Sequence, residues 1–506
     1  MSTATTLVNA CLLPAYDGRT PPGWILRALD EGLAGVGLFG TNLRSTGRGL
    51  REDIVDPIRA VRPDALIALD EEGGDVTRLD YHRGSVYPGN HALGSVDDPE
   101  LTRRVALAVG ADLRAAGINL CLGPCADVNS RPDNPIIGVR SFGSRPGPVA
   151  RHTRAFVQGL QEHGVAATLK HFPGHGDTVT DSHTALPDIH RDLDALRALD
   201  LPPFAGGIAA GAKAVMTGHI RLPHLSDLPA TLSHRIVTGL LREELGHEGV
   251  VISDAMEMAP VRDRWGFGGA AVLAWSAGVD LVLLGATDGE LLLPEVHRAV
   301  EHALRTGQLT LERLEEAAAR VAALRAWAAP TAAPHPGPLT TAPAGSAPGS
   351  ENGSGIGLAA ARRALASAGL PPVAPGEPVH SVRLVTGANM AVGTAPWGLA
   401  PALKLLDALA SDTDVEQGTD PRNVPLPDTG PVAVAVRDAA LDPWQRAALD
   451  ALRARRPDLV TVEMGLGPQT PEPGGRLVLT RGAGLVNAVA AAELLTGRTC
   501  TGPLRA

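Results

Sequence analysis

The chain has 506 residues, of which 44% are hydrophobic and 20% are charged, and its formal net charge is −10. This composition is typical of a globular protein, and the length predicts more than one domain. A negative charge without a long basic run argues against a nucleic-acid partner, and no apolar stretch approaches the ~18 residues of a membrane-spanning helix.

The N-terminal segment holds a short apolar run at residues 7–13 with no basic region before it. The run predicts a strand instead of a signal peptide, which favours a cytoplasmic protein. The cysteines are scattered, at Cys11, Cys121, Cys125 and Cys500. Cys121 and Cys125 lack the partner pair that a zinc ribbon needs, so we expect buried thiols.

Up to residue 328, short apolar runs alternate with longer amphipathic segments. Such nearly continuous apolar runs are typical of parallel strands buried on both faces. The clearest helix begins after Asp98, a favourable N-cap followed by Pro99, and ends at Gly117. The alternation predicts a (β/α)₈ TIM-type barrel over residues 1–328. We expect its strands at residues 7–13, 36–39, 66–70, 118–122, 166–171, 214–217, 250–254 and 280–284.

Residues 329–355 are rich in proline, alanine, glycine and serine, which predicts a linker. Residues 356–506 predict a smaller αβ domain with an open sheet flanked by helices, without a dense group of polar residues. We expect its strands at residues 382–385, 432–436, 459–462 and 477–479. We expect its helices at residues 358–368, 400–409, 443–454 and 485–495.

Several apolar runs of the barrel end in a charged or titratable residue. In parallel barrels, active-site groups lie at the carboxyl ends of the strands. The strand ends carry Asp70, Lys170, His171, His219 and Asp254. We therefore expect chemistry at this edge of the barrel.

The segment 169–187 packs three histidines, two acids and one lysine into a short run. Its polar residues follow no helical or strand period, and its proline and glycines would interrupt either element. In one interpretation it is an active-site loop in which His183, paired with Asp181, transfers protons. In another it binds a metal, and in a third it is a surface loop.

The sequence KHFPGHGDTVTDSH at residues 170–183 resembles the signature of glycoside hydrolase family 3, in its bacterial β-N-acetylglucosaminidase branch. Three further stretches resemble family motifs in the same order. They are DEEGGDVTR at 70–78, DVNSRPDNPIIGVRSFG at 127–143 and VVISDAMEM at 250–258. The resemblance covers nearly all of the expected barrel and is much looser after the linker.

The resemblance implies a (β/α)₈ hydrolase that releases terminal β-linked N-acetylglucosamine with retention of configuration, from cell-wall (muropeptide) or chitin-type fragments. Position by position, Asp254 matches the nucleophile, and His183 with Asp181 matches the acid/base dyad. The residues that hold the sugar match Asp70, Arg78, Arg140, Lys170 and His171. His175 and His219 are further candidates for the pocket, although a role of His175 in shaping the loop is slightly favoured.

The implied partner is a carbohydrate, with no cofactor, no metal and no membrane. The sequence departs from the family pattern at Asp75, Thr77 and Cys125, where the family often has a basic residue, glutamine and an aliphatic residue. The biological role that the resemblance implies is the recycling of cell-wall fragments.

The residues themselves support this chemistry. An unperturbed imidazole titrates near pH ~6.5, so His183 can donate and accept a proton near neutrality. Asp181, two residues away, can hold its tautomer. Other candidate residues also have a structural alternative. For Asp254 it is a role as the N-cap of the next helix. For Arg78 and Arg140 it is a salt bridge with Asp70 or Asp127.

Other functions stay open at this point. An imidazole donor does not repel phosphate, which would allow an N-acetylglucosaminide phosphorylase. A β-glucosidase and a metal-dependent barrel hydrolase with His171, His175 and Asp177 as ligands are further alternatives. A sugar-binding barrel without activity is disfavoured by the intact Asp254, Asp181 and His183. Because every candidate residue precedes the linker, we expect the barrel alone to be catalytic.

Overall fold

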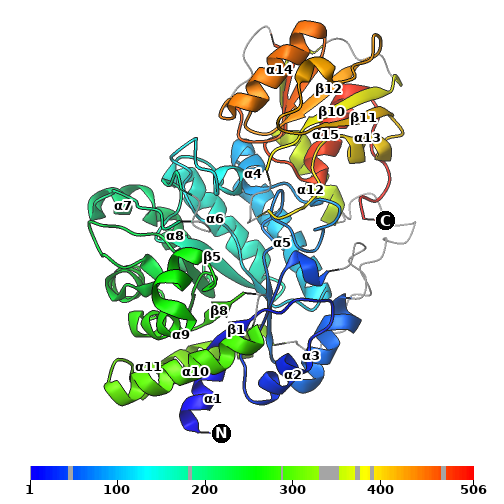
Figure 1. Ribbon diagram of the computed structural model, residues 1–506. Helices are drawn as coiled ribbons and strands as arrows, with labels where there is room; N and C mark the ends of the chain where they lie inside the picture. Colours follow the sequence, from blue (N-terminus) through cyan, green and yellow to red (C-terminus); the bar gives the residue numbers. More distant parts are fainter. Residues whose placement is uncertain are drawn as a thin grey trace. The chain divides into compact units, whose positions relative to one another are not determined.

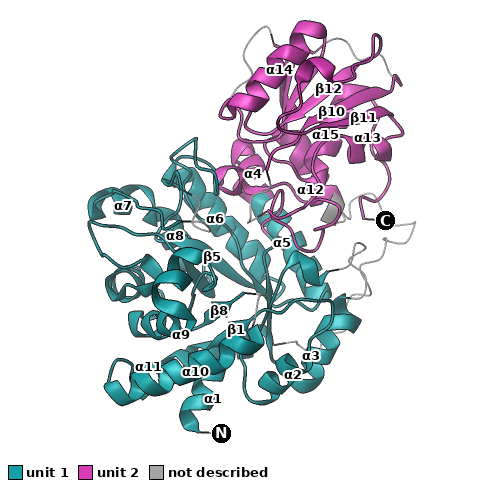
Figure 2. Cartoon of the chain, viewed as in Figure 1, with its two compact units in different colours: residues 1–71, 102–137, 143–340 teal, residues 72–101, 138–142, 341–506 magenta. Residues whose placement is uncertain are grey.

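The computed structural model describes residues 2–43, 50–180, 185–285, 289–329, 353–370, 376–387, 392–468 and 475–505. The chain divides into two compact units, which Figure 2 shows in different colours. Unit 1 comprises Met1–Glu71, Thr102–Ile137 and Gly143–Thr340. Unit 2 comprises Glu72–Leu101, Gly138–Phe142 and Thr341–Ala506. Most of the expected linker, residues 330–352, lies outside the described residues, and the expected limits at 328 and 356 stay a prediction.

Unit 1 contains a curled parallel sheet with helices between its strands, so the predicted (β/α)₈ barrel is confirmed. Strands β2 to β7 pair in sequence order, and β1 pairs with β8. Bridges Ala15–Gly37 and Ile252–Leu281 join the two sets. The strands are β1 (Leu12–Pro14), β2 (Gly35–Leu38), β3 (Leu66–Leu69), β4 (Leu120–Cys121), β5 (Ala166–Phe172), β6 (Ala214–Thr217), β7 (Val250–Ile252) and β8 (Val282–Leu284).

Helices surround the strands in Figure 1, and this arrangement explains why the strands are apolar on both faces. Each of the barrel strands is buried along its whole length. The helices of the barrel sequence are α1 (Thr3–Ala10), α2 (Gly23–Asp30), η2 (Arg51–Val55), α3 (Asp56–Val61), α5 (Pro99–Ala115), α6 (Pro146–Gln161), α7 (Leu193–Leu199), α8 (Leu201–Ala209), η5 (Arg235–Glu244), α9 (Ala259–Ala277), α10 (Gly289–Thr306) and α11 (Leu311–Ala328).

Local capping accounts for where some of these helices begin and end. At the start of α5, the Asp98 carboxylate accepts the N–H of Leu101 at 3.1 Å, and Pro99 supplies a preset φ angle. At the end of α9, Gly278 adopts a φ of 115°, which terminates the helix in the left-handed region. The helix that the sequence predicted from Asp98 to Gly117 is confirmed.

The N-terminal prediction was partly wrong. Residues 7–10 belong to α1, and the strand is confined to Leu12–Pro14. The Ser2 hydroxyl caps α1 by accepting the N–H of Thr5 at 3.2 Å. Because a short apolar run suits a buried helix as well as a buried strand, the cap decides the conformation here.

Unit 2 contains an open, mostly parallel sheet flanked by helices, as predicted. Its strand order is β11-β10-β12-β13-β14-β9, in which only β9 runs antiparallel to its neighbour among the described residues. The strands are β9 (Ala366–Ala368), β10 (Val379–Leu384), β11 (Leu409–Val415), β12 (Val432–Val436), β13 (Val460–Glu463) and β14 (Leu477–Leu479). The helices are α4 (Asn90–Val96), α12 (Gly353–Ala364), α13 (Ala400–Leu405), α14 (Pro443–Arg455) and α15 (Leu485–Thr496).

Strands β9 and β11 of this sheet were not predicted. Residues 366–368 were expected to end a helix, and of residues 409–415 only Leu409 was expected to be helical. Both lie at an edge of the sheet. In β11 the exposed positions include Ser411, Asp412 and Asp414. Edge strands bury only part of their side chains, so they lack the continuous apolar pattern that identified the central strands.

Two segments from the first half of the sequence belong to unit 2. Helix α4 contacts α12 and the short helix η3 (Gly138–Arg140). At Gly94 a Cβ atom would lie 1.8 Å from the carbonyl oxygen of Phe142, so only glycine permits this approach. Among the described residues, no helix combines the length and hydropathy needed to cross a membrane.

Candidate functional site

Asp70 and Lys170 lie together at the carboxyl ends of strands in unit 1. Asp70 follows β3 and Lys170 lies near the end of β5. The Lys170 Nζ donates to Oδ1 of Asp70 at 2.6 Å, and the Lys170 side chain is only 3% exposed. This charge-assisted hydrogen bond orients both groups in a place with little water.

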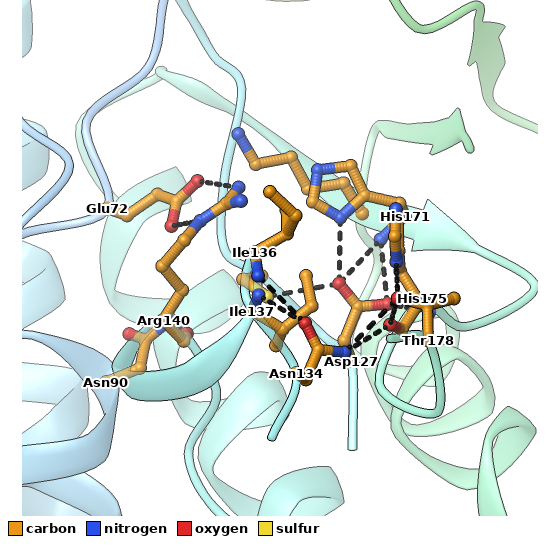
Figure 3. A network of polar contacts seen from close by, with 12 residues as sticks. Glu72, Asn90, Asp127, Asn134, Ile136, Ile137, Arg140, His171, His175 and Thr178 are labelled. Carbon is orange, nitrogen blue, oxygen red and sulfur yellow. Dashed lines mark hydrogen bonds and ion pairs between the residues drawn. The ribbon is translucent and has the colours of Figure 1, made fainter. Parts of the chain in front are cut away.

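Asp127 organises the start of the titratable loop (Figure 3). Its buried carboxylate accepts the backbone N–H of His171 at 3.2 Å and that of His175 at 2.7 Å, and lies 2.8 Å from Nδ1 of His171. Burial would raise the pKa of Asp127, but the charge and hydrogen bond of His171, together with His175, hold it at about 2. The ionised carboxylate only accepts, so Nδ1 of His171 carries the proton.

The sequence analysis named Asp127 only as a possible partner of the arginines. The sequence did contain a pattern that could have identified Asp127 as a site residue, because it comes shortly after an apolar run and is the first residue of the motif at 127–143. What the sequence lacked was the partner, since His171 lies 44 positions further along the chain. In unit 1, Asp127 is therefore a missed member of the candidate site.

His175 lies inside the loop, and its Nδ1 and carbonyl oxygen both make hydrogen bonds that hold the turn. Its Nδ1 lies 2.8 Å from Oγ1 of Thr178, and its carbonyl oxygen accepts from Asn134 at 2.9 Å (Figure 3). Burial, helped by the positive charge of His171, lowers the pKa of His175 to about 4. A histidine that is neutral at ordinary pH and bonded to its own turn fits the structural role that the sequence favoured.

Asp177 belongs to an ion cluster instead of a group with the histidines. Its carboxylate lies 3.2 Å from Nε of Arg191, which also pairs with Asp200 and donates to Ser130 at 2.6 Å. The metal site considered from the sequence, with His171, His175 and Asp177 as ligands, is therefore not assembled. Across the described part of the chain, the atoms that come within 4.8 Å of one another as possible ligands belong to Cys125, Asp127 and His171.

The expected acid/base dyad, Asp181 and His183, lies in residues 181–184, outside the described residues. Its role therefore stays a prediction.

Asp254 follows β7 and is partly buried. The N–H of Ala255 donates to its Oδ1 at 2.8 Å, which fixes the rotation of the carboxylate. His219 is fully buried, with Nδ1 2.9 Å from Oγ1 of Thr231 and Nε2 3.1 Å from the carbonyl oxygen of Ala255. Since a carbonyl only accepts, Nε2 carries the proton. His219 thus holds the backbone beside Asp254.

In unit 2, Arg140 forms a buried ion pair with Glu72 (Figure 3). Nε and one terminal nitrogen donate to the two carboxylate oxygens at 3.0 and 2.8 Å, and both side chains are at most 5% exposed. Asn90 donates to the carbonyl oxygen of Arg140 at 2.7 Å. Glu72 lies in the motif at residues 70–78, but it was not among the predicted site residues. The 68 positions between Glu72 and Arg140 hid the pairing.

Arg78, also in unit 2, is 6% exposed, and its guanidinium lies 5.9 Å from the centre of the Tyr81 ring. The neighbouring Thr77 is fully buried and its hydroxyl accepts the N–H of Asp80 at 3.2 Å. Thr77, which departs from the family pattern, therefore stabilises the turn at residues 77–80 through this hydrogen bond.

The family model described as "Glycosyl hydrolase family 3 N terminal domain" matches residues 27–324. The β-hexosaminidase A of Pseudoalteromonas piscicida is 38% identical over 280 residues, which are 51% of this chain and 47% of that protein. This chain thus spans about half the length of that relative. The β-hexosaminidase of Xylella fastidiosa (strain M23) is 39% identical over 266 residues, which are 50% of this chain and 77% of that protein.

Among solved structures, a glycoside hydrolase family 3 β-N-acetylglucosaminidase from Paenibacillus sp. str. FPU-7 matches 100% of this chain and 99% of its own. The TM-score is 0.83 and the identity 29%. The β-N-acetylhexosaminidase of Beutenbergia cavernae matches 64% of this chain and 99% of its own, with a TM-score of 0.58 and 31% identity. The likeness to the Paenibacillus enzyme includes unit 2 as well as the barrel.

Proposed function

The chain belongs to glycosyl hydrolase family 3, a family of glycosidases, and from that premise we propose that it releases terminal β-linked N-acetylglucosamine with retention of configuration. The full-length match to the Paenibacillus β-N-acetylglucosaminidase carries this proposal. Muropeptide or chitin-type fragments are the proposed substrates, and recycling of cell-wall fragments in the cytoplasm belongs to the same proposal.

In the proposed mechanism, Asp254 is the nucleophile. Retaining hydrolysis needs a carboxylate on one face of the anomeric carbon, which forms a covalent glycosyl-enzyme intermediate. The hydrogen bond from Ala255 and the contact of His219 with the same residue restrain the approach of the carboxylate. Because the carboxylate loses this orientational freedom when the protein folds, the loss does not add to the activation barrier of the reaction.

The proton donor in this proposal is His183, supported by Asp181. The imidazolium would protonate the glycosidic oxygen as the aglycone leaves, and the neutral imidazole would then take a proton from the attacking water. Asp181 would hold the tautomer that presents the correct nitrogen. The Asp-Ser-His spacing and the family motif support these roles.

The proposed sugar-holding groups are complementary in charge and hydrogen-bonding capacity. Asp70 can accept from two hydroxyls, and Lys170 donates. The Nδ1 of His171 is held by Asp127, so Nε2 is the ring atom proposed to hydrogen-bond a sugar hydroxyl. Arg78 and Arg140 are assigned to the sugar by their motif positions.

The test is chromophore release from an aryl N-acetyl-β-glucosaminide beside the matching aryl β-glucoside, with a chelator present. Fast cleavage of only the acetamido sugar is the expected result. Preference for the glucoside would overturn the sugar specificity, and loss of activity in the chelator would favour a metal enzyme. Formation of sugar 1-phosphate in phosphate buffer would identify a phosphorylase.

A further inference from the structure

Residues 72–87 form a segment of unit 2 that carries Arg78, and we call it the Arg78 segment. Two buried carboxylates flank the arginine. Asp75 precedes it by three positions and Asp80 follows it by two, and their side chains are only 2% and 4% exposed. Carboxylates buried to this degree are costly unless they are paired, so their partners indicate what holds the segment.

Both partners of Asp75 come from the far end of the sequence. Its Oδ2 pairs with the Arg437 guanidinium, and its Oδ1 accepts the N–H of Ala483 at 2.7 Å. Arg437 directly follows β12 and lies 5.3 Å from the ring centre of Trp397. Asp75 is therefore bonded to two residues that come after different strands of the second sheet, Arg437 after β12 and Ala483 after β14.

Asp80 is held in the same manner by Arg505. The guanidinium donates to both carboxylate oxygens, at 2.9 and 2.7 Å, and lies 5.5 Å from the ring centre of Tyr87. Tyr81, whose ring lies beside Arg78, accepts the N–H of Thr394 through its hydroxyl at 3.1 Å. Residues from four regions beyond the expected linker thus contact the Arg78 segment.

We infer that Arg437 and Arg505 are positioning residues that hold Arg78 through the carboxylates of Asp75 and Asp80. This inference rests on the proposed function, in which Arg78 binds the sugar. It assigns a role to unit 2 and reverses the expectation that the barrel sequence alone is catalytic.

The physical reason is the entropy of the segment. Without its two ion pairs, the Arg78 segment loses bonds that restrict its backbone, and each buried carboxylate loses a charged partner. Arg78 would then have to be ordered when the sugar binds, which weakens binding. An interaction made equally in the ground state and the transition state changes KM more than kcat.

The test compares the variants Arg437→Gln and Arg505→Gln in the full chain with the control Arg362→Gln. Arg362 forms an equally close bidentate pair with Glu493, at 2.7 and 2.7 Å, but it joins α12 to α15. We expect KM for the aryl N-acetyl-β-glucosaminide to rise roughly tenfold in each test variant with kcat within threefold. The control should keep the wild-type KM.

Two further measurements separate positioning from general damage to unit 2. Backbone amide exchange of residues 72–87 should accelerate in Arg505→Gln and not in Arg362→Gln. The pair Asp80→Asn and Arg505→Gln should be non-additive in KM, and Arg505→Lys should recover part of the loss. Unchanged KM and unchanged exchange in both test variants would overturn the inference, as would equal losses in the control.

The two proposals fail in different ways. If the wild-type enzyme does not cleave the acetamido substrate, the proposed function is wrong, while the exchange measurement still reports whether the two arginines hold the segment. If the wild-type enzyme is active and the variants keep its KM, only the positioning role is wrong.

Discussion

The Nζ atom of Lys170 lies 2.6 Å from Oδ1 of Asp70, although the two residues are 100 positions apart. Asp70 follows β3 and Lys170 lies in β5, and β4 separates these two strands in the barrel. The contact therefore forms across a strand at the carboxyl edge, where the parallel barrel brings strand ends together. It joins a donor and an acceptor that are both suited to sugar hydroxyls.

Replacing Lys170 with methionine should lower kcat/KM roughly a hundredfold, because the partly buried Asp70 carboxylate loses the charge-assisted hydrogen bond that orients it. Arg131→Met is the control, since Arg131 and Asp133 form an ion pair of similar type that is 44% and 51% exposed. An exposed pair of this kind contributes little. Steady-state kinetics of both variants decide the point, and equal effects would remove the special role of Lys170.

Asp254→Ala should lower kcat by at least roughly a thousandfold, since no covalent intermediate can form. Unfolding temperature should change little, because Asp254 is only partly buried. Asp263→Ala is a suitable control, since Asp263 is exposed and pairs with its neighbour Arg262. Mass measurement after quenching should detect bound sugar on the wild-type chain and none on the Asp254 variant. Turnover near the wild-type rate would exclude this nucleophile.

His183→Ala should lower kcat roughly a hundredfold or more with an aryl glycoside whose leaving group is basic. The loss should be smaller with an activated leaving group, because its departure needs no proton. Measuring both substrates in the variant tests the acid role, and added imidazole should restore part of the rate. His163→Ala, which removes an exposed histidine, is the control. Equal losses with both leaving groups would contradict proton donation.

Glu72→Gln should destabilise unit 2 by about 3 kcal/mol, because it leaves the Arg140 guanidinium buried without its bidentate carboxylate. Replacing both residues, with Glu72→Gln and Arg140→Met together, should recover part of that stability. The double variant should still have a raised KM if Arg140 binds the sugar. Chemical denaturation beside kinetics separates the two effects. A single variant as stable as the wild type would show that the pair contributes nothing.

Stability should fall between pH 6.5 and pH 4, partly because of the buried His247. Burial lowers the pKa of His247 to about 4, and its Nε2 donates to the carbonyl oxygen of Val250 at 3.2 Å. The unfolded chain binds the proton near pH ~6.5 and the folded chain does not, so acid favours unfolding in this window. His247→Gln should therefore reduce the slope of unfolding free energy against pH by up to about 1.4 kcal/mol per pH unit. Equal slopes in the two proteins would contradict this.

Local patterns in the sequence carry a large part of the fold. Continuous apolar runs identified the central strands of both sheets, because strands covered on both faces exclude polar residues. The two edge strands, β9 and β11, were missed for the complementary reason, since solvent on one side permits a polar sequence. Capping residues such as Asp98 marked helix starts reliably, whereas Ser2 was overlooked beside an ambiguous apolar run.

The sequence by itself determined the barrel, the candidate residues at its strand ends and the family to which they belong. Only the tertiary structure decided the partners, because the pairs Asp127–His171, Glu72–Arg140 and Asp75–Arg437 are 44, 68 and 362 positions apart. Local periodicity reports which face of an element is buried, and it contains no information on which distant charge will lie opposite. The Arg78 segment belongs to unit 2 because its partners are distant in the sequence. Only the tertiary structure shows these partners.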